Sequence, residues 1–205
     1  MVHKLLNVVL GIVLLAVSGC TDSPAPSNSW NEPSLTQSET PTDAGVSARA
    51  RITFVKLPAS AEPRIEKSVT KRISGLLGGT IDVDYSYRKL NGGQCTLHAK
   101  LIVPPLALLR DETITVALDT VNAAVKFLPE GLTFLVPSLL DYSATGLDPQ
   151  SLGLLLGLYY VDDSGRTTKM PTGGISVNIT AGTLGLRLGV IPHFSRYIFG
   201  RITDK

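Results

Sequence analysis

Apolar and polar residues alternate along most of this chain, and that period of two restricts its fold more than any other feature. Six segments show the alternation: 81–88, 94–101, 114–118, 132–136, 175–180 and 184–190. Because successive side chains of a strand point to opposite faces, each segment predicts a half-buried β-strand. No segment longer than about ten residues has a helical period. Leu101 and Phe134 are expected on core faces.

Turn sequences separate these segments: Gly78-Gly79, Asn91-Gly92-Gly93, Pro129-Glu130-Gly131, Asp163-Ser164-Gly165 and Pro171-Thr172-Gly173-Gly174. Glycine, asparagine and proline at such places favour tight turns between antiparallel strands. The predicted fold class is therefore all-β, an antiparallel β-sandwich. Residues 149–158 are ambiguous, and a helical turn leading into a strand at 154–161 is one interpretation.

The first 19 residues predict a secretory signal. A short start containing Lys4 precedes an apolar run from Leu5 to Val17, which is too short to span a bilayer comfortably. The run ends in Ser18-Gly19-Cys20, which resembles the lipobox of bacterial lipoproteins. That resemblance implies lipidation of Cys20 by a diacyl group and an amino-terminal acyl chain, and an anchor in the bilayer. In such lipoproteins an aspartate after the lipidated cysteine is the signal for retention in the inner membrane. The resemblance with Thr21 at this position therefore implies the outer membrane of a bacterial cell envelope.

Residues 20–49 follow as the lipidated cysteine and a predicted disordered tether. They are rich in Ser, Thr, Pro, Asn, Asp and Glu and have almost no aliphatic residues. Such a segment cannot bury enough apolar surface to offset its ordering entropy. Residues 50–205 have the length of one domain. The chain is thus divided into a signal peptide at 1–19, the tether at 20–49 and a β-sandwich at 50–205.

Residues 50–205 have 17 Lys and Arg and 13 Asp and Glu, and this net charge of +4 is too small and too scattered to indicate nucleic-acid binding. Lys67, Lys71 and Arg72 form the densest basic group, and a solvated strand or loop face explains them better than an anionic ligand. No cofactor fingerprint is present. The sequence therefore predicts neither a nucleic-acid partner nor a cofactor.

Cys95 is the only cysteine after Cys20, and its place in the alternation predicts an inert core thiol. The histidines of the mature chain, His98 and His193, are expected on separate strands, which disfavours a metal site. Asp162 and Asp163 precede Ser164-Gly165, so turn formation explains them better than calcium. No metal ligands are predicted.

Several motifs in residues 75–141 resemble a known module. They are Gly78-Gly79 before a strand, Ala99–Leu108, Ile114–Leu118, Phe127–Phe134 and Val136–Leu139. The pattern is similar to the family named after zonula occludens proteins and uncoordinated-type netrin receptors, which includes the spectrin-binding domain of ankyrins. The Pro105-Leu106-Ala107-Leu108 corner lacks the glycine that this family usually has before alanine. The resemblance implies a β-sandwich without catalytic chemistry.

The tripeptide His193-Phe194-Ser195 resembles one that closes related domains in many bacterial surface proteins. In some animal death-domain adaptors it is a self-cleavage site, broken between Phe and Ser. The resemblance implies Ser195 as nucleophile, His193 as base or orienting group, and the Phe194 carbonyl as electrophile. Two positions apart in a strand, His193 and Ser195 would share a face. The alternative is that these are packing residues of the last strand.

Together these features predict a membrane-anchored envelope lipoprotein, a non-enzymatic interaction or structural β-sandwich with an unknown protein or glycan partner. One alternative is a self-cleaving domain that breaks once between Phe194 and Ser195. Another is a carbohydrate-binding envelope protein that uses exposed aromatics. Its candidate residues are Tyr85, Tyr87, Tyr159 and Tyr160. Core positions suit at least half of these tyrosines.

Overall fold

The computed structural model describes residues 51–203, and these form an all-β fold with one short 3₁₀ turn. The first seven strands are β1 (Arg51–Phe54), β2 (Lys67–Ile73), β3 (Gly79–Arg88), β4 (Gln94–Val103), β5 (Glu112–Leu118), β6 (Ala124–Leu128) and β7 (Thr133–Thr145). After the turn η1 (Pro149–Ser151) come β8 (Leu156–Val161), β9 (Thr167–Lys169), β10 (Gly174–Asn178), β11 (Thr183–His193) and β12 (Arg196–Thr203). The predicted signal peptide, tether and Cys20 lie outside the described residues.

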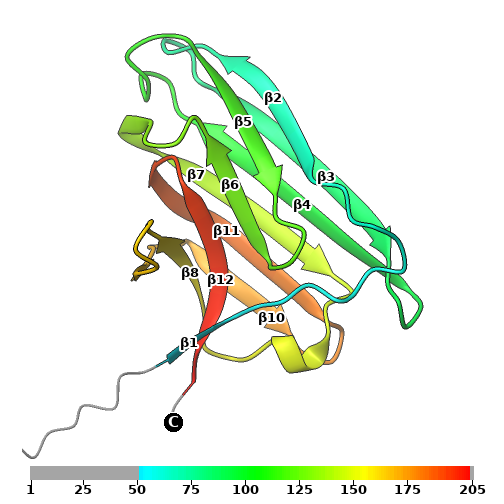
Figure 1. Cartoon of the computed structure of the whole chain (residues 1–205). Coiled ribbons are helices and arrows are strands. Elements are labelled where there is room, and N and C mark those ends of the chain that lie inside the picture. The colour runs from blue at the N-terminus through cyan, green and yellow to red at the C-terminus, as the bar shows by residue number, and fades with distance from the viewer. Residues whose placement is uncertain (1–50, 204–205) are drawn as a thin grey trace, which may run out of the picture. The chain divides into compact units, whose positions relative to one another are not determined.

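Two antiparallel sheets pack face to face, which confirms the predicted β-sandwich (Figure 1). The seven-stranded sheet has the order β2-β5-β6-β12-β8-β9, and β1 also pairs with β12. The five-stranded sheet has the order β10-β11-β7-β4-β3. The last strand of the sequence therefore lies in the middle of the larger sheet.

The chain passes from one sheet to the other four times at the same end of the sandwich. These passages are the segments 74–78, 104–111, 129–132 and 194–195. We refer to this region as the crossover end; it lies at the top and upper left in Figure 1. Arg51, the first described residue, lies away from the crossover end, because it pairs with Thr203 at the far end of β12.

The alternation predicts the core faces of β3, β4 and β5 correctly. Along β4, Cys95, Leu97, Ala99 and Leu101 are all buried, and their polar neighbours are more exposed. The largest fully buried side chains include these: Phe127, Phe194, Tyr197, Phe199, Leu97, Leu101, Ile114 and Leu158. Removing this much aliphatic and aromatic surface from water stabilises the two-layer fold.

Beyond Leu186, the alternation expected for 184–190 does not hold. The alternation predicts that Leu188 and Val190 are buried. A register shift separates Leu186 from Gly189, so Gly189 and Ile191 are buried instead and Leu188 is exposed. The extra residue of a β-bulge moves every following side chain to the other face. Leu188 itself has φ +50°, outside the normal strand region.

The start of β7 also differs from the prediction. Val136, expected on the core face with Phe134, is exposed, and Phe134 is half-buried against the core, while Leu101 is fully buried as expected. The pairing of β4 with β7 ends at Ile102 opposite Leu139, so the first residues of β7 extend past β4. For residues 149–158, the helical-turn interpretation is confirmed by η1, and the strand that follows begins at Leu156.

Candidate functional site

The tripeptide His193-Phe194-Ser195 forms a corner between the two sheets. His193 ends β11 in the smaller sheet, Phe194 and Ser195 form a bend, and Arg196 begins β12 in the larger sheet. The expectation that the three residues lie within one strand was therefore wrong. Their side chains do not follow strand alternation, because the chain changes direction at the peptide bond that joins Phe194 to Ser195.

Hydrogen bonds hold the backbone of this corner from both sides. The Phe194 N–H donates to the Leu132 carbonyl at 2.7 Å, and the Gly131 N–H donates to the Phe194 carbonyl at 3.0 Å. The Phe127 N–H donates to the Ser195 carbonyl at 3.0 Å. The β6–β7 turn thus fixes the orientation of the Phe194–Ser195 peptide bond.

The His193 ring packs against aromatic residues. Its centroid lies 4.6 Å from that of Tyr160, in an edge-on arrangement, and 6.2 Å from that of Tyr197. The Tyr197 hydroxyl donates to the His193 carbonyl at 2.7 Å, and burial raises the pKa of that hydroxyl. Among residues 51–203, no hydrogen bond joins the His193 ring to the Ser195 hydroxyl.

Phe194 anchors the corner in the core. Its ring is stacked on Phe127 with centroids 5.4 Å apart and meets Phe134 edge-on at 4.9 Å. Only 1% of Phe194 is exposed, whereas His193 and Ser195 are half-buried. The corner therefore has one packing residue between two side chains that solvent can reach.

A cavity of about 320 Å³ adjoins Arg196, directly after the corner. Its charged lining residues include Asp119 and Lys126. An Arg196 nitrogen lies 2.6 Å from Asp119, and Lys126 lies 2.8 Å from Glu130. Because both cations already have acidic partners, the cavity presents no unpaired positive charge to an anionic ligand.

Cys95 and the basic group lie where the sequence predicts. Cys95 is fully buried, and desolvation raises the pKa of its thiol, which disfavours the reactive thiolate. Lys67, Lys71 and Arg72 are exposed on β2, an edge strand of the larger sheet. Exposed cations on an edge strand discourage pairing with another sheet.

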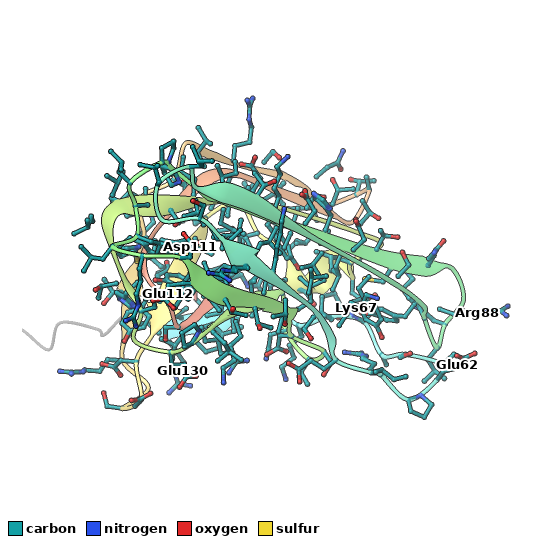
Figure 2. All side chains as sticks on the ribbon, turned by 90° about the horizontal axis from the view of Figure 1, so that it is seen from above. Glu62, Lys67, Arg88, Asp111, Glu112 and Glu130 are labelled. Atoms are coloured by element: carbon teal, nitrogen blue, oxygen red, sulfur yellow. The ribbon has the colours of Figure 1, made fainter. Side chains whose placement is uncertain are left out.

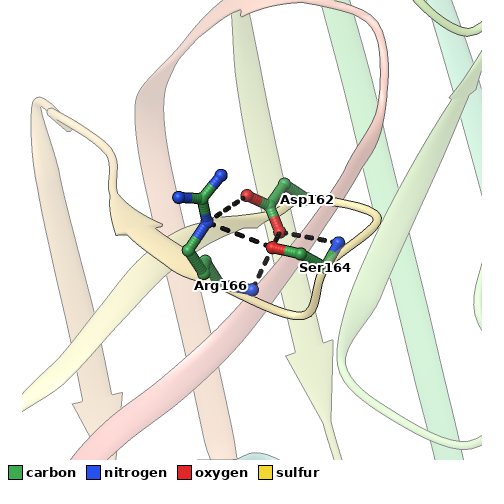
Figure 3. Close-up of polar contacts among 3 residues, drawn as sticks. All are labelled: Asp162, Ser164 and Arg166. Atoms are coloured by element: carbon green, nitrogen blue, oxygen red, sulfur yellow. Dashed lines mark hydrogen bonds and ion pairs between the residues drawn. The ribbon is translucent and has the colours of Figure 1, made fainter.

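Asp162 organises the β8–β9 turn, as the turn interpretation predicts (Figure 3). Its carboxylate accepts hydrogen bonds from the Ser164 N–H at 2.9 Å, the Ser164 hydroxyl at 2.6 Å and the Arg166 N–H at 2.8 Å. The hydroxyl bond, with further bonds from Arg166, lowers the pKa of Asp162 to about 2. Within residues 51–203, no group of three or more histidine, cysteine or acidic residues could hold a metal ion.

The tyrosines proposed as glycan contacts pack against apolar residues. Tyr87 and Tyr159 are buried, and Tyr85 and Tyr160 are half-buried against the core.

Among residues 51–203 there is no helix long and apolar enough to cross a bilayer. Comparison with protein-family models, curated proteins and solved structures finds no match to this chain.

Proposed function

We propose that this protein is a bacterial envelope lipoprotein. In this proposal a β-sandwich is tethered to the membrane, the outer one where there are two, by acyl chains on Cys20. The domain acts as a non-enzymatic interaction or structural module. The observation that carries the proposal is the apolar run from Leu5 to Val17 that ends in Ser18-Gly19-Cys20.

We also propose that the domain belongs to the family of zonula occludens proteins, netrin receptors and ankyrins, because of the motifs in residues 75–141. Two of them adjoin in the fold. Gly78 has φ +68°, and a Cβ there would lie 2.2 Å from the Val103 carbonyl oxygen and 2.6 Å from a Pro104 backbone atom. Glycine is thus required where the first motif meets the proline corner, which suits a structural role for both.

Metabolic labelling with an alkyne analogue of palmitate tests the anchor. The wild-type protein should incorporate the label and partition with membranes, and Cys20→Ser should lose the label. The matched control is Cys95→Ser, because Cys95 is the only free cysteine among the described residues and is buried. Retention of the label in Cys20→Ser, or its loss in Cys95→Ser alone, would refute the assignment.

Self-cleavage between Phe194 and Ser195 is the second candidate function. The observation that favours it is the 3.0 Å hydrogen bond from the Gly131 N–H to the Phe194 carbonyl. A donor already aimed at this oxygen would stabilise the negative charge that develops there during attack. The sheet-to-sheet corner also holds Ser195 next to the carbonyl it would attack.

The proposed chemistry needs only this chain and water. The Ser195 hydroxyl oxygen attacks the Phe194 carbonyl carbon, the carbon–nitrogen bond breaks, and the nitrogen takes the hydroxyl proton. An ester then joins Phe194 to Ser195. Water hydrolyses this ester, leaving a carboxylate on Phe194 and a free amine on Ser195. His193 would accept or orient the proton.

Intact mass spectrometry under denaturing conditions is the measurement for this candidate. Denaturation is needed because β12 pairs with β6, β8 and β1 and would hold the released segment in place. Cleavage should vanish in Ser195→Ala, persist in part in Ser195→Cys, and slow by about 10²–10⁴ in His193→Ala. A wild-type protein that keeps its full-length mass after long incubation would refute self-cleavage and leave a packing motif.

A further inference from the structure

Six aliphatic residues at the crossover end are exposed to solvent. They are Leu76 (66%), Leu77 (74%), Leu106 (59%), Leu109 (88%), Leu135 (65%) and Val136 (45%). We call this set the apolar cap. Its combined exposure equals that of about four whole leucines. Monomeric soluble proteins rarely expose large contiguous apolar patches that have no partner.

Backbone hydrogen bonds join the three segments that carry the apolar cap. The Leu106 N–H donates to the Gly75 carbonyl at 3.1 Å, which connects the passage at 104–111 to the one at 74–78. The Leu135 N–H donates to the Ala107 carbonyl at 2.9 Å, which connects it to β7. The exposed leucines therefore lie on fixed neighbouring segments.

Leu106 adds an observation of its own. Its φ of +61° is in the left-handed region, which a bulky residue rarely occupies, and its side chain is exposed. Packing in the core cannot be the reason for leucine at this position. Residues held in such strained conformations are enriched at functional sites.

Charged residues border the apolar cap in oppositely charged pairs. An Arg72 nitrogen lies 3.4 Å from an Asp111 oxygen, and the Arg110 Nε lies 2.8 Å from a Glu112 oxygen. Figure 2 shows Asp111 and Glu112 together at this end, away from Arg88 and Glu62. These two pairs carry no net charge, and Lys71 on β2 adds a single positive charge. An anionic lipid surface would instead attract a cluster of several cations.

We propose that the apolar cap binds the apolar cap of a second copy of this chain. A two-fold axis brings the same patch of both copies together, and because the charges of each border are already paired within the chain, the two borders meet without strong like-charge repulsion. Four leucine equivalents from each copy would form the apolar centre. This names a partner for the interaction module and rests on the proposed function in that respect alone.

The attachment of the rest of the chain permits such a pair. The described chain enters at Arg51, which pairs with Thr203 at the end of β12 distant from the crossover end. The 30 residues between Cys20 and Arg51 could reach about 100 Å if extended. A strand of 13 residues, such as β7, is about 45 Å long. Two copies anchored in one membrane could therefore bring their crossover ends together.

Crosslinking of the full chain in intact cells tests the pair. Leu77→Cys, Leu109→Cys and Leu135→Cys place a thiol at three points of the apolar cap, and a short bismaleimide should join two copies at one or more of them. Leu155→Cys is the matched control, since Leu155 is 72% exposed before β8 and outside the cap. Mass spectrometry of the product must show this chain twice. A product with another protein, or none at all three positions, would overturn the proposal.

A charge in the apolar cap should separate the copies. Leu109→Glu should lower their association constant at least about tenfold in sedimentation experiments on the purified chain, and Leu155→Glu should leave it unchanged. Both residues are exposed, and thermal melts should show that both variants fold. Equal effects of the two variants would contradict the pairing. The pairing would also be contradicted if the wild-type protein stayed monomeric and floated with phosphatidylcholine–phosphatidylglycerol vesicles in a way that depends on the cap residues.

The pairing and the anchor fail in different measurements. Cys20→Ser removes the acyl label if the anchor is correct, and crosslinking through Leu109→Cys should continue in that background. Loss of the crosslink with an intact label in the wild-type background would refute the pairing alone. A label that persists in Cys20→Ser together with a normal crosslink would refute the anchor alone.

Discussion

Phe194→Ala is expected to lower the free energy of unfolding by about 3–5 kcal/mol, the usual cost of removing a buried phenylalanine. The ring is 1% exposed and lies between Phe127 and Phe134 at the corner where β11 leads into β12. Its removal would leave a cavity among aromatic rings that the surrounding strands cannot close. Denaturant unfolding followed by circular dichroism measures the change.

Leu155→Ala is the control for this substitution. Leu155 lies outside the apolar cap and is 72% exposed, so the expected change is within about 0.5 kcal/mol. If Phe194→Ala lowers the stability by less than about 1 kcal/mol, the corner is not packed as described. The two proteins should unfold with similar denaturant slopes, since the substitution alters no large exposed area.

Gly146→Ala should cost about 2–5 kcal/mol. Gly146 follows β7 with φ +74°, and a Cβ there would lie 2.1 Å from the Gln94 carbonyl oxygen. The left-handed conformation alone costs a side-chain-bearing residue roughly 1–2 kcal/mol, and forcing atoms into a packed site typically adds about 1–3 kcal/mol. Because the obstacle is backbone, a rotamer change cannot relieve it.

Gly92→Ala separates the two contributions to that cost. Gly92 lies in the β3–β4 hairpin with φ +84°, and a Cβ there would meet no atom within 4 Å. It should therefore show only the conformational cost of roughly 1–2 kcal/mol. Equal losses for the two alanine variants in the same thermal or urea melts would show that contact with Gln94 is unimportant.

Strands whose two faces differ in burial could be predicted from the sequence. In β3, β4 and β5, one face packs into the core and the other meets solvent, so the side chains alternate in kind. β2 was not assigned because it is an edge strand on which only Ile73 is buried. β1 was missed because it has only four residues, and β6 because four of its five residues are apolar and the neighbours Ala124 and Val125 are both buried.

Bulges and long-range pairing could not be predicted in the same way. The bulge at Arg187 and Leu188 interrupts a regular alternation, and its local sign is weak: glycine inside a strand often marks a bulge, but both Gly185 and Gly189 fit the expected alternation. The place of β12 between β6 and β8 depends on contacts with strands far away in the sequence. Alternation identifies which side of a strand is apolar but gives no information on its neighbours.

For the candidate site, the sequence identified the residues but not their geometry. His193 and Ser195 were expected on one face of a strand, whereas the bend at Phe194 and Ser195 leads from one sheet into the other. The hydrogen bond from Gly131 depends on a turn more than 60 residues earlier and has no local signal. The apolar cap was not predicted either, because its residues lie on three segments that are far apart in the sequence and meet only in the folded chain.

The central position of β12 has a consequence for how the chain folds. Arg51 pairs with Thr203, 152 positions away, and β6 and β8 also depend on β12 for one of their edges. Such distant pairings carry a high loop-closure entropy and make folding slow. A nascent chain cannot complete the larger sheet until residue 203 has been synthesised. If the chain is exported as proposed, its sandwich would therefore still be incomplete when translation ends, which would favour passage through a narrow channel before the sandwich closes.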